Sequence, residues 1–295
     1  MNRNILHITI AALAALAVFS GAFSSNIEAM NWPSESAVLY RNFGWNDKGR
    51  PVLGMVFTGG NEIQAAESGE VIFSRAAGET ASRLPSPLGA WTAVDHGDGL
   101  VSIYSRYAAD SGMLSQVEKQ QPVASAGISG WSNREGFYFI LYDRKERRWI
   151  NPSMIITPRR EARPPMIYSV NLLNSQGQNV NDMQMRNISQ GRYTILVTPV
   201  SGIFTDRDPF HALQRIVCSI NGAEAGSLNF ESVSARDGVL MISRNGLVPV
   251  NQIYSNFPAF EAAEVFLNRG QITLEVIVQD ISGDSRSAFT RLIVN

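Results

Sequence analysis

The 295-residue sequence predicts an all-β protein built from two domains. Runs of alternating β-branched, aromatic and polar residues recur along the chain beyond residue 29, and glycine-bearing turns separate them. The chain length suits two domains of about 100–150 residues each. Hydrophobic residues make up 44% and charged residues 17% of the chain, so each domain can bury a core and need not be disordered.

The first 29 residues have the features of an export signal. A short polar start containing Arg3 precedes an uncharged apolar run at 5–23, and residues 27–29 (Ile-Glu-Ala) fit the small-residue rule for a cleavage site. We therefore expect a signal peptide at 1–29 and a mature chain that is periplasmic or associated with the cell envelope. The alternative is an uncleaved anchor, because an apolar run of this length nearly spans a bilayer.

A charged, proline-bearing stretch, PRREARPP at 158–165, is typical of a linker. We therefore place the two domains at 30–160 and 161–295. In the second domain, evenly spaced runs such as RYTILVTPV and ITLEVIVQDI are separated by turn signals such as SQGQN and SGDS. This spacing predicts an immunoglobulin-like β-sandwich. Residues 257–268 are expected to hold one or two helical turns.

Composition excludes several classes of function. The net charge of −1 provides no overall attraction to nucleic acid, so no nucleic-acid partner is expected. The single cysteine, Cys218, excludes a disulfide within the chain and any multi-cysteine metal site, and we expect it to be a buried, inert thiol. Of the three histidines, His7 lies in the apolar N-terminal run, which leaves His96 and His211. Nothing in the sequence indicates a small-molecule cofactor.

Residues 50–152 contain the most informative segments, and all are predicted to be β. They are NEIQAAESGEVIFS at 61–74, WTAVDHGDGLVSIYSRY at 91–107, QVEKQQPVASAGISGWS at 116–132 and GFYFILYDRKERRWINP at 136–152. The sequence DHGDG predicts a tight hairpin turn, because glycine tolerates positive φ and aspartate can bond turn amides. This turn chemistry outweighs an acid–base or cation site at Asp95, His96 and Asp98. The basic tip at 144–148 is predicted to be a solvated turn, with contact to an anionic polymer as the alternative.

In order and spacing, these segments resemble the lysostaphin/LytM-type zinc peptidases of peptidoglycan, which have the duplicated-hybrid-motif fold. The resemblance implies zinc ligands and catalytic histidines in an early HxxxD-type motif, a YxH motif and an HxH motif. The corresponding positions here lie near Arg50–Gly54, at Arg106, and at about Phe137 and Phe139, and none carries a metal ligand. The resemblance therefore implies the peptidase fold with no catalytic residue and no bound metal.

A vestigial groove is expected where the active site of such a peptidase would lie. Alternation along a strand places Phe137 and Phe139 on one face, which we expect to present two phenyl rings to the groove. Arg106 and Arg50 are expected nearby, with Arg106 stacked on a ring. These four residues are the predicted binding residues. The alternative is a closed groove in which both phenylalanines are core.

The function implied by the resemblance is that of non-catalytic LytM-like regulators of the EnvC/NlpD type. Such a protein would bind peptidoglycan, or a cell-wall amidase or other envelope protein, and regulate wall remodelling or division. The chain lacks the coiled coil or LysM module that these regulators often carry. Two alternatives stay open: an active zinc endopeptidase with an atypical site, and a structural or adhesive envelope protein.

Overall fold

The computed structural model describes residues 29–47, 50–76, 86–110, 114–156, 165–180, 187–200, 213–280 and 283–295. The predicted signal peptide up to residue 28, most of the predicted linker, His7 and His211 lie outside these residues. No helix in the described ranges is long and apolar enough to cross a membrane.

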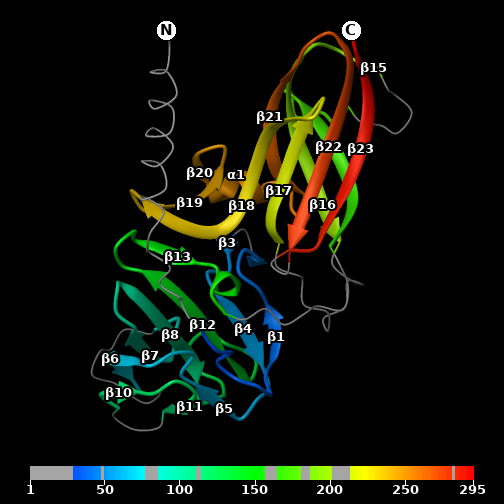
Figure 1. Ribbon diagram of the computed structural model, residues 1–295. Coiled ribbons are helices and arrows are strands. Elements are labelled where there is room, and N and C mark those ends of the chain that lie inside the picture. The colour runs from blue at the N-terminus through cyan, green and yellow to red at the C-terminus, as the bar shows by residue number, and fades with distance from the viewer. Residues whose placement is uncertain are drawn as a thin grey trace, which may run out of the picture.

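The protein is almost entirely β, which confirms the predicted class. Within the described residues the helical elements are one short α-helix, α1 (Val250–Tyr254), and one 3-10 turn, η1 (Pro152–Met154). Two hydrophobic cores organise the strands, and Figure 1 shows one body of strands around each core. We call the core surrounded by strands β1 to β13 the first core, and the core surrounded by strands β14 to β23 the second core.

The first core is enclosed by a twisted sheet and a small three-stranded sheet. The main sheet has the order β10-β6-β7-β8-β12-β13, with β4 pairing with β12 and with β1. Its strands are β1 (Val38–Arg41), β4 (Met55–Thr58), β6 (Gly69–Arg75), β7 (Ala90–Asp95), β8 (Leu100–Tyr107), β10 (Gln116–Val117), β12 (Gly136–Asp143) and β13 (Arg148–Ile150). The small sheet contains β5 (Glu62–Gln64), β11 (Pro122–Ser125) and β9 (Ala109–Asp110), and a separate ladder joins β2 (Asn46–Asp47) to β3 (Arg50–Pro51).

The predicted hairpin at 91–107 is confirmed, and its turn has the expected chemistry. Strands β7 and β8 flank the DHGDG turn, where Gly97, Asp98 and Gly99 all have positive φ values of 84°, 50° and 88°. Glycine reaches this region without steric cost, and aspartate does so more readily than most residues. Asp95 accepts a hydrogen bond of 3.0 Å from the Gly97 N–H, which closes the turn.

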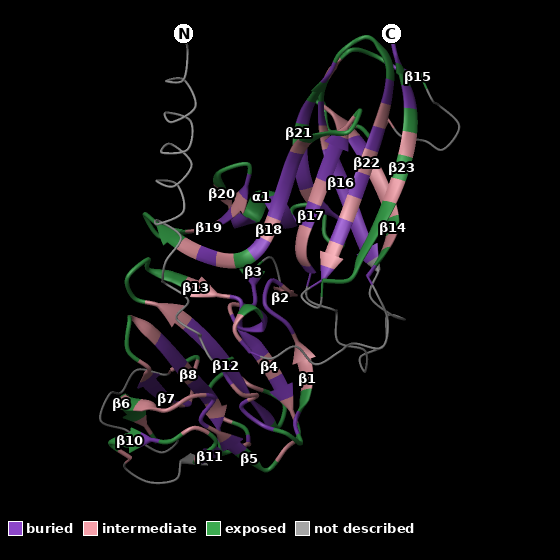
Figure 2. Cartoon of the chain, in the orientation of Figure 1, coloured by how far each residue is buried: buried purple, intermediate pink, exposed green. Residues whose placement is uncertain are grey.

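The second core lies between two sheets that form a sandwich. One sheet contains β17 (Leu213–Ile220), β18 (Ala223–Arg236), β22 (Gly270–Asp280), β23 (Ser285–Val294) and β15 (Asn187–Ile188), with β19 (Val239–Arg244) and β20 (Leu247–Pro249) attached to β18. The other contains β14 (Met166–Asn174), β16 (Gly191–Val200) and β21 (Phe260–Leu267). Figure 2 shows buried residues alternating with exposed ones along several of these strands, as expected where one face of a sheet packs on a core. The immunoglobulin-like assignment stays a prediction.

The prediction of helical turns at 257–268 is wrong, because residues Phe260–Leu267 form strand β21. The sequence FEAAEVFL contains good helix formers, but it pairs with β16 along its length, with one register shift at Ile195/Leu196, and it buries Phe260, Ala262, Val265 and Leu267 in the second core. Tertiary pairing therefore overrides local propensity here. The helix forms earlier, at α1.

The two cores are joined by a strand pair. β13 pairs antiparallel with β18, so that one continuous sheet passes from the first core to the second. Figure 1 shows β18 extending from the second body of strands towards β13. The Asn151 side chain, which is fully buried, donates a hydrogen bond of 3.0 Å to the Phe230 carbonyl. The predicted boundary at 160/161 falls in residues 157–164, outside the described ranges, and stays a prediction.

His96 ties the β7–β8 turn to its surroundings. Its Nδ1 donates to the Ser68 carbonyl oxygen at 2.8 Å, and its Nε2 then accepts from the Ser102 hydroxyl at 2.8 Å. Burial lowers the pKa of His96 below its usual 6.5, with smaller opposing effects from the Ser68 bond, Glu67 and Asp95. The folded protein therefore holds this imidazole in its neutral form.

We expect His96 to make the protein less stable in mild acid. Below pH 6.5 the unfolded chain binds a proton that the folded state resists, so the free energy of unfolding falls as pH decreases, by at most about 1.4 kcal/mol per pH unit. Urea unfolding between pH 7.5 and 5.5 measures this slope. In His96→Gln the slope should decrease, whatever the variant's absolute stability. An unchanged slope would show that another group titrates. The Glu67 carboxyl does not interfere, because its pKa is lowered below 4.5.

Candidate functional site

Three segments converge where the family resemblance placed a metal site: the chain at 50–54, the end of β8 and the start of β12. The Tyr138 ring lies at their meeting point. The Leu53 N–H donates to the Tyr138 Oη at 2.8 Å, and the Arg106 guanidinium carbon lies 4.9 Å from the Tyr138 ring centroid. A Cβ on Gly54 would lie 3.0 Å from the Tyr138 ring and 2.1 Å from the Phe139 carbonyl oxygen, so only glycine fits there. Arg106 stacks on a ring, but the ring is that of Tyr138.

Phe137 and Phe139 do share one face of β12, but that face packs in the first core. Phe139 is 0% exposed and Phe137 is 2% exposed. The Phe137 ring stacks on Phe57 with centroids 4.6 Å apart, in register with the pairing of β12 and β4. The expectation that both rings face the groove is therefore corrected. Phe137 reaches the inner wall of the groove, and Phe139 is not among the lining residues.

An open groove of about 810 Å³ lies beside the Tyr138–Arg106 stack. Of the described residues that line it, four are arginines and Asp47 is the only acidic one. The groove is lined by Tyr40, Arg41, Asp47, Arg50, Pro51, Val52, Val56, Phe57, Thr58, Arg106, Trp131, Ser132, Asn133, Arg134, Phe137 and Tyr138. Asp47 already pairs with Arg41 at 3.1 Å. The groove is therefore cationic and partly aromatic, and it includes the predicted residues Arg50 and Arg106.

Aromatic rings contact three of the groove's four arginines, including Arg106 on Tyr138. The Arg134 guanidinium carbon lies 4.6 Å from the Tyr40 ring centroid, and that of Arg41 lies 5.1 Å from the same centroid. Arg106 has a left-handed backbone with φ of 67°, and its N–H donates to the Leu88 carbonyl at 2.8 Å. A guanidinium stacked on a ring can still donate N–H bonds to a ligand, because these bonds point outward in the guanidinium's own plane. These cations are thus oriented before any ligand binds.

Trp131 projects from an anchored loop at the edge of the groove. Its side chain is 72% exposed, although its own N–H donates to the Pro87 carbonyl at 3.2 Å. Gly130 has φ of 62°, and a Cβ on it would lie 2.4 Å from the Gly89 nitrogen, so two glycines pack backbone against backbone. The Ala90 N–H donates to the Ser129 Oγ at 3.1 Å. An exposed indole on such a fixed loop is suited to contact a ligand.

Sequence reasoning missed Trp131, Arg41, Arg134 and Tyr40. The segment at 116–132, which contains Trp131, was predicted to be β, and its tryptophan was given no binding role. A lone tryptophan between glycine and serine residues was the available signal, since large aromatic residues are uncommon in glycine-bearing loops. Nothing in the sequence could place Arg41 and Arg134 around one ring, because they are far apart in the chain.

Among the described residues, no group of three or more His, Cys, Asp or Glu side chains could hold a metal ion. Burial raises the pKa of Tyr138 well above its ordinary value, so its phenol stays neutral near pH 7 and is a poor base. Burial likewise raises the pKa of Cys218 to about 12, which makes this thiol unreactive.

The basic hairpin tip at 144–148 is occupied by local ion pairs. Arg144 pairs with Asp95, Lys145 with Asp98 at 3.5 Å, and Arg148 with Asp143 at 3.4 Å. This arrangement matches the prediction of a solvated turn. The groove, with a single acid among four arginines, is the stronger candidate for contact with an anion.

Comparisons with known proteins give one matching family model and several similar solved structures. A protein-family model matches residues 164–295. No curated protein sequence gives a match.

The SpoIIQ–SpoIIIAH pore-forming complex is similar at 18% identity and a TM-score of 0.36, over 44% of this chain and 92% of that one. The catalytic domain of the prophage-encoded M23 protein EnpA from Enterococcus faecalis is similar at 19% identity and a TM-score of 0.35, over 42% and 94%. Lysostaphin from Staphylococcus simulans is similar at 12% identity and a TM-score of 0.32, over 83% and 84%. Structures similar to this chain thus include M23-type peptidases and SpoIIQ, at low identity.

Proposed function

We propose that this chain is a non-catalytic, LytM-like protein of the cell envelope whose groove binds the carboxylate-bearing peptides of peptidoglycan and so regulates wall remodelling or division. The observation that carries the proposal is the lining of the groove: four arginines, one acid and an exposed tryptophan. Export to the envelope is part of the proposal and rests on the N-terminal sequence.

The groove suits a carboxylate-bearing, partly apolar ligand. Arginine binds a carboxylate through two parallel N–H···O bonds, which are stronger than neutral hydrogen bonds. Arg41 and Arg134 already lie against Tyr40, so less conformational entropy is lost when they bind a ligand. Trp131 offers a flat apolar face to a sugar ring or an aliphatic side chain. A volume of about 810 Å³ lies in the range of ordinary ligand sites.

Ligand binding is a better assignment than peptide hydrolysis because of the side chains that are present beside the groove. A ring and a guanidinium occupy the place where hydrolysis would need a water and its activating groups. The Tyr138 hydroxyl already accepts a hydrogen bond of 2.8 Å from the Leu53 N–H. The Gly54 backbone packs so closely against the Tyr138 ring that no side-chain atom fits between them. The charged side chains that line the groove are four arginines and Asp47. The arginines stabilise bound anions but take up no proton at neutral pH.

We expect Trp131→Ala and Arg134→Gln each to weaken binding to isolated cell-wall sacculi about fivefold or more, since exposed stacking and charge contacts contribute about 1 kcal/mol. Pelleting of the mature protein with increasing amounts of sacculi measures the affinity, and soluble fragments are assayed with and without added zinc. Arg236→Gln is the matched control, because it removes the same charge from an exposed position at the end of β18, outside the groove. It should leave binding unchanged.

The same assay can contradict the proposal in two ways. Release of fragments that depends on zinc would favour the active endopeptidase. Equal binding by the wild type and both groove variants would remove the groove from the interaction. If the wild type does not pellet at all, the wall ligand is wrong, and an acidic segment of an envelope protein becomes the ligand to test.

A further inference from the structure

One hairpin is shared between the groove and the second core. Its described residues, 44–47 and 50–52, include β2 and β3, and they are joined by hydrogen bonds of 2.8 Å from the Gly44 N–H to the Val52 carbonyl and from the Val52 N–H to the Trp45 carbonyl. We call this segment the groove hairpin. Asp47, Arg50, Pro51 and Val52 from the hairpin line the groove. The next residue, Leu53, holds the Tyr138 phenol and also packs against the second core.

The base of the groove hairpin is fixed by residues of the second core. The Tyr254 hydroxyl, at the end of α1, donates a hydrogen bond to the Gly44 carbonyl. Gly44 has φ of 78°, and a Cβ on it would lie 2.9 Å from the Phe230 ring. The Trp45 ring lies edge-on to Phe257, with centroids 6.4 Å apart. The chain direction at Gly44, where the hairpin begins, is therefore set by Tyr254 and Phe230.

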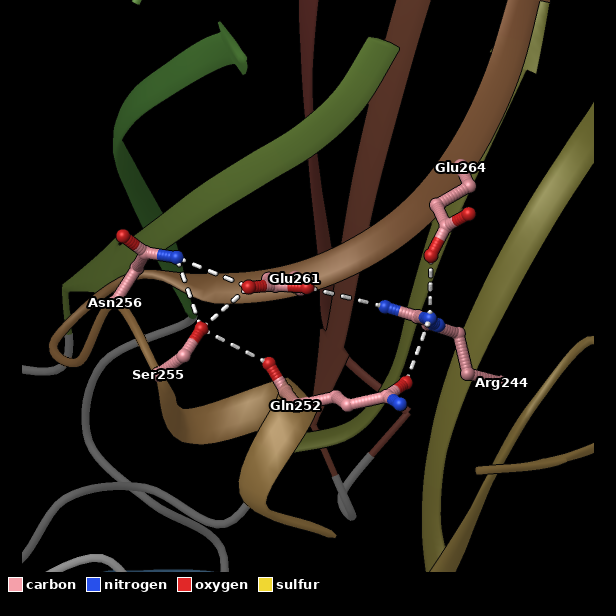
Figure 3. A network of polar contacts seen from close by, with 6 residues as sticks. All are labelled: Arg244, Gln252, Ser255, Asn256, Glu261 and Glu264. Atoms are coloured by element: carbon pink, nitrogen blue, oxygen red, sulfur yellow. Dashed lines mark hydrogen bonds and ion pairs between the residues drawn. The ribbon is translucent and has the colours of Figure 1, made fainter. Parts of the chain in front are cut away.

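A network of polar side chains holds α1, and hence Tyr254, in place. Figure 3 shows Arg244 from β19 between Glu261 of β21 and Gln252 of α1, with Ser255 also bonded to Glu261. The Arg244 side chain is only 7% exposed, and it also bonds Glu264 at 2.8 Å. The position of Tyr254 is thus determined by residues of the second core and not by residues of the groove.

We propose that Tyr254 is a positioning residue for the groove, through which the second core controls the groove's affinity for anionic ligands. The binding part of this inference rests on the proposed function. Removing the hydroxyl leaves the buried Gly44 carbonyl without its partner, and the hairpin must shift or admit water. Asp47 and Arg50 then lose their fixed positions. Because coupling is reciprocal, a ligand in the groove also stabilises the contact between the two cores.

Tyr254→Phe in the full chain tests the inference, with Tyr193→Phe as the matched control. Tyr193 is equally buried, at 5% exposure, in the same core, and its hydroxyl donates to the Ser189 carbonyl at 2.6 Å, away from the hairpin. Hydrogen–deuterium exchange of the ligand-free protein is expected to be about fivefold faster at the amides of Gly44 and Val52 in Tyr254→Phe, from the loss of one buried hydrogen bond. Tyr193→Phe should leave exchange at these two amides unchanged.

Binding of a fluorescein-labelled hexaglutamate peptide provides the second readout. Its affinity is expected to fall about fivefold in Tyr254→Phe and to stay constant in Tyr193→Phe. Unchanged exchange at the hairpin overturns the positioning role. Faster exchange with unchanged peptide affinity overturns the control of the groove. If the wild type does not bind the peptide, the proposed anion site has failed, and the exchange result alone decides the positioning role.

A second variant keeps the test decisive if Tyr254→Phe does not fold. Phe257 is 37% exposed, and replacing it by leucine removes the edge contact with Trp45 while burying little less apolar surface. Phe257→Leu should change hairpin exchange and peptide affinity in the same direction. Wild-type values for both would overturn the proposal.

Discussion

Replacing Phe137 with alanine is expected to lower the free energy of unfolding by about 3–5 kcal/mol, the usual cost of truncating a buried phenylalanine. The ring is 2% exposed and stacks on Phe57 at 4.6 Å with an interplanar angle of 12°. Truncation removes this contact and leaves a cavity between β12 and β4, where paired backbones limit relaxation. Urea-induced unfolding, followed by tryptophan fluorescence, measures the loss.

Phe289→Ala is the control for this prediction. Phe289 is 65% exposed on β23, so its truncation should change the free energy of unfolding by no more than about 0.5 kcal/mol. A loss below about 1 kcal/mol in Phe137→Ala would place that ring outside the core, as the sequence alone suggested. The expected result also means that Phe137→Ala is unsuitable for testing binding, because unfolding would be mistaken for lost affinity.

Replacing Arg244 with methionine is expected to lower the free energy of unfolding by about 2–4 kcal/mol. The Arg244 side chain is 7% exposed, and its partner Glu261 is 17% exposed (Figure 3). Without the guanidinium, the Glu261 carboxylate keeps its bonds from Ser255 and Asn256 but loses its nearby cation. A nearly buried charge without a counter-ion is costly, while methionine fills most of the arginine's volume, so the loss reports mainly the charge.

Glu264→Gln separates the buried pair from the exposed one. The Glu264 side chain is 62% exposed and lies 2.8 Å from the same guanidinium, so this ion pair is screened by water. Its loss should cost less than about 1 kcal/mol. Equal losses in Arg244→Met and Glu264→Gln would contradict the view that burial at Glu261 makes the network important. Chemical denaturation of the two variants at pH 7 makes the comparison.

Local chemistry made the first-core hairpins predictable. The DHGDG turn requires positive φ at consecutive residues, and its glycines and aspartates meet that need without help from the rest of the fold. The alternation in β8 and the apolar run in β12 were equally clear, and both strands are confirmed. Long-range pairing was much less predictable. β21 was expected to be helical because its alanines and glutamates favour helix, and only its pairing with β16 made it a strand.

Which side of β12 faces the groove could not be read from the sequence. A strand has two faces with a period of two, and a shift of one residue exchanges them completely. The predicted pair, Phe137 and Phe139, was correctly placed on one face, but pairing with β4 turns that face into the core. Tyr138 therefore meets Arg106, and the predicted stacking of Arg106 occurs on the residue between the two that were named.

The all-β class, the turns and the residue types at the three segments beside the groove could be derived from local composition and spacing alone. That Arg41, Arg106, Arg134 and Trp131 share one groove became evident only in the folded chain, because these residues lie on segments far apart in sequence that meet through the register of paired strands. The contact between the second core and the groove hairpin likewise depends on a long-range bond, from the Tyr254 hydroxyl to the Gly44 carbonyl.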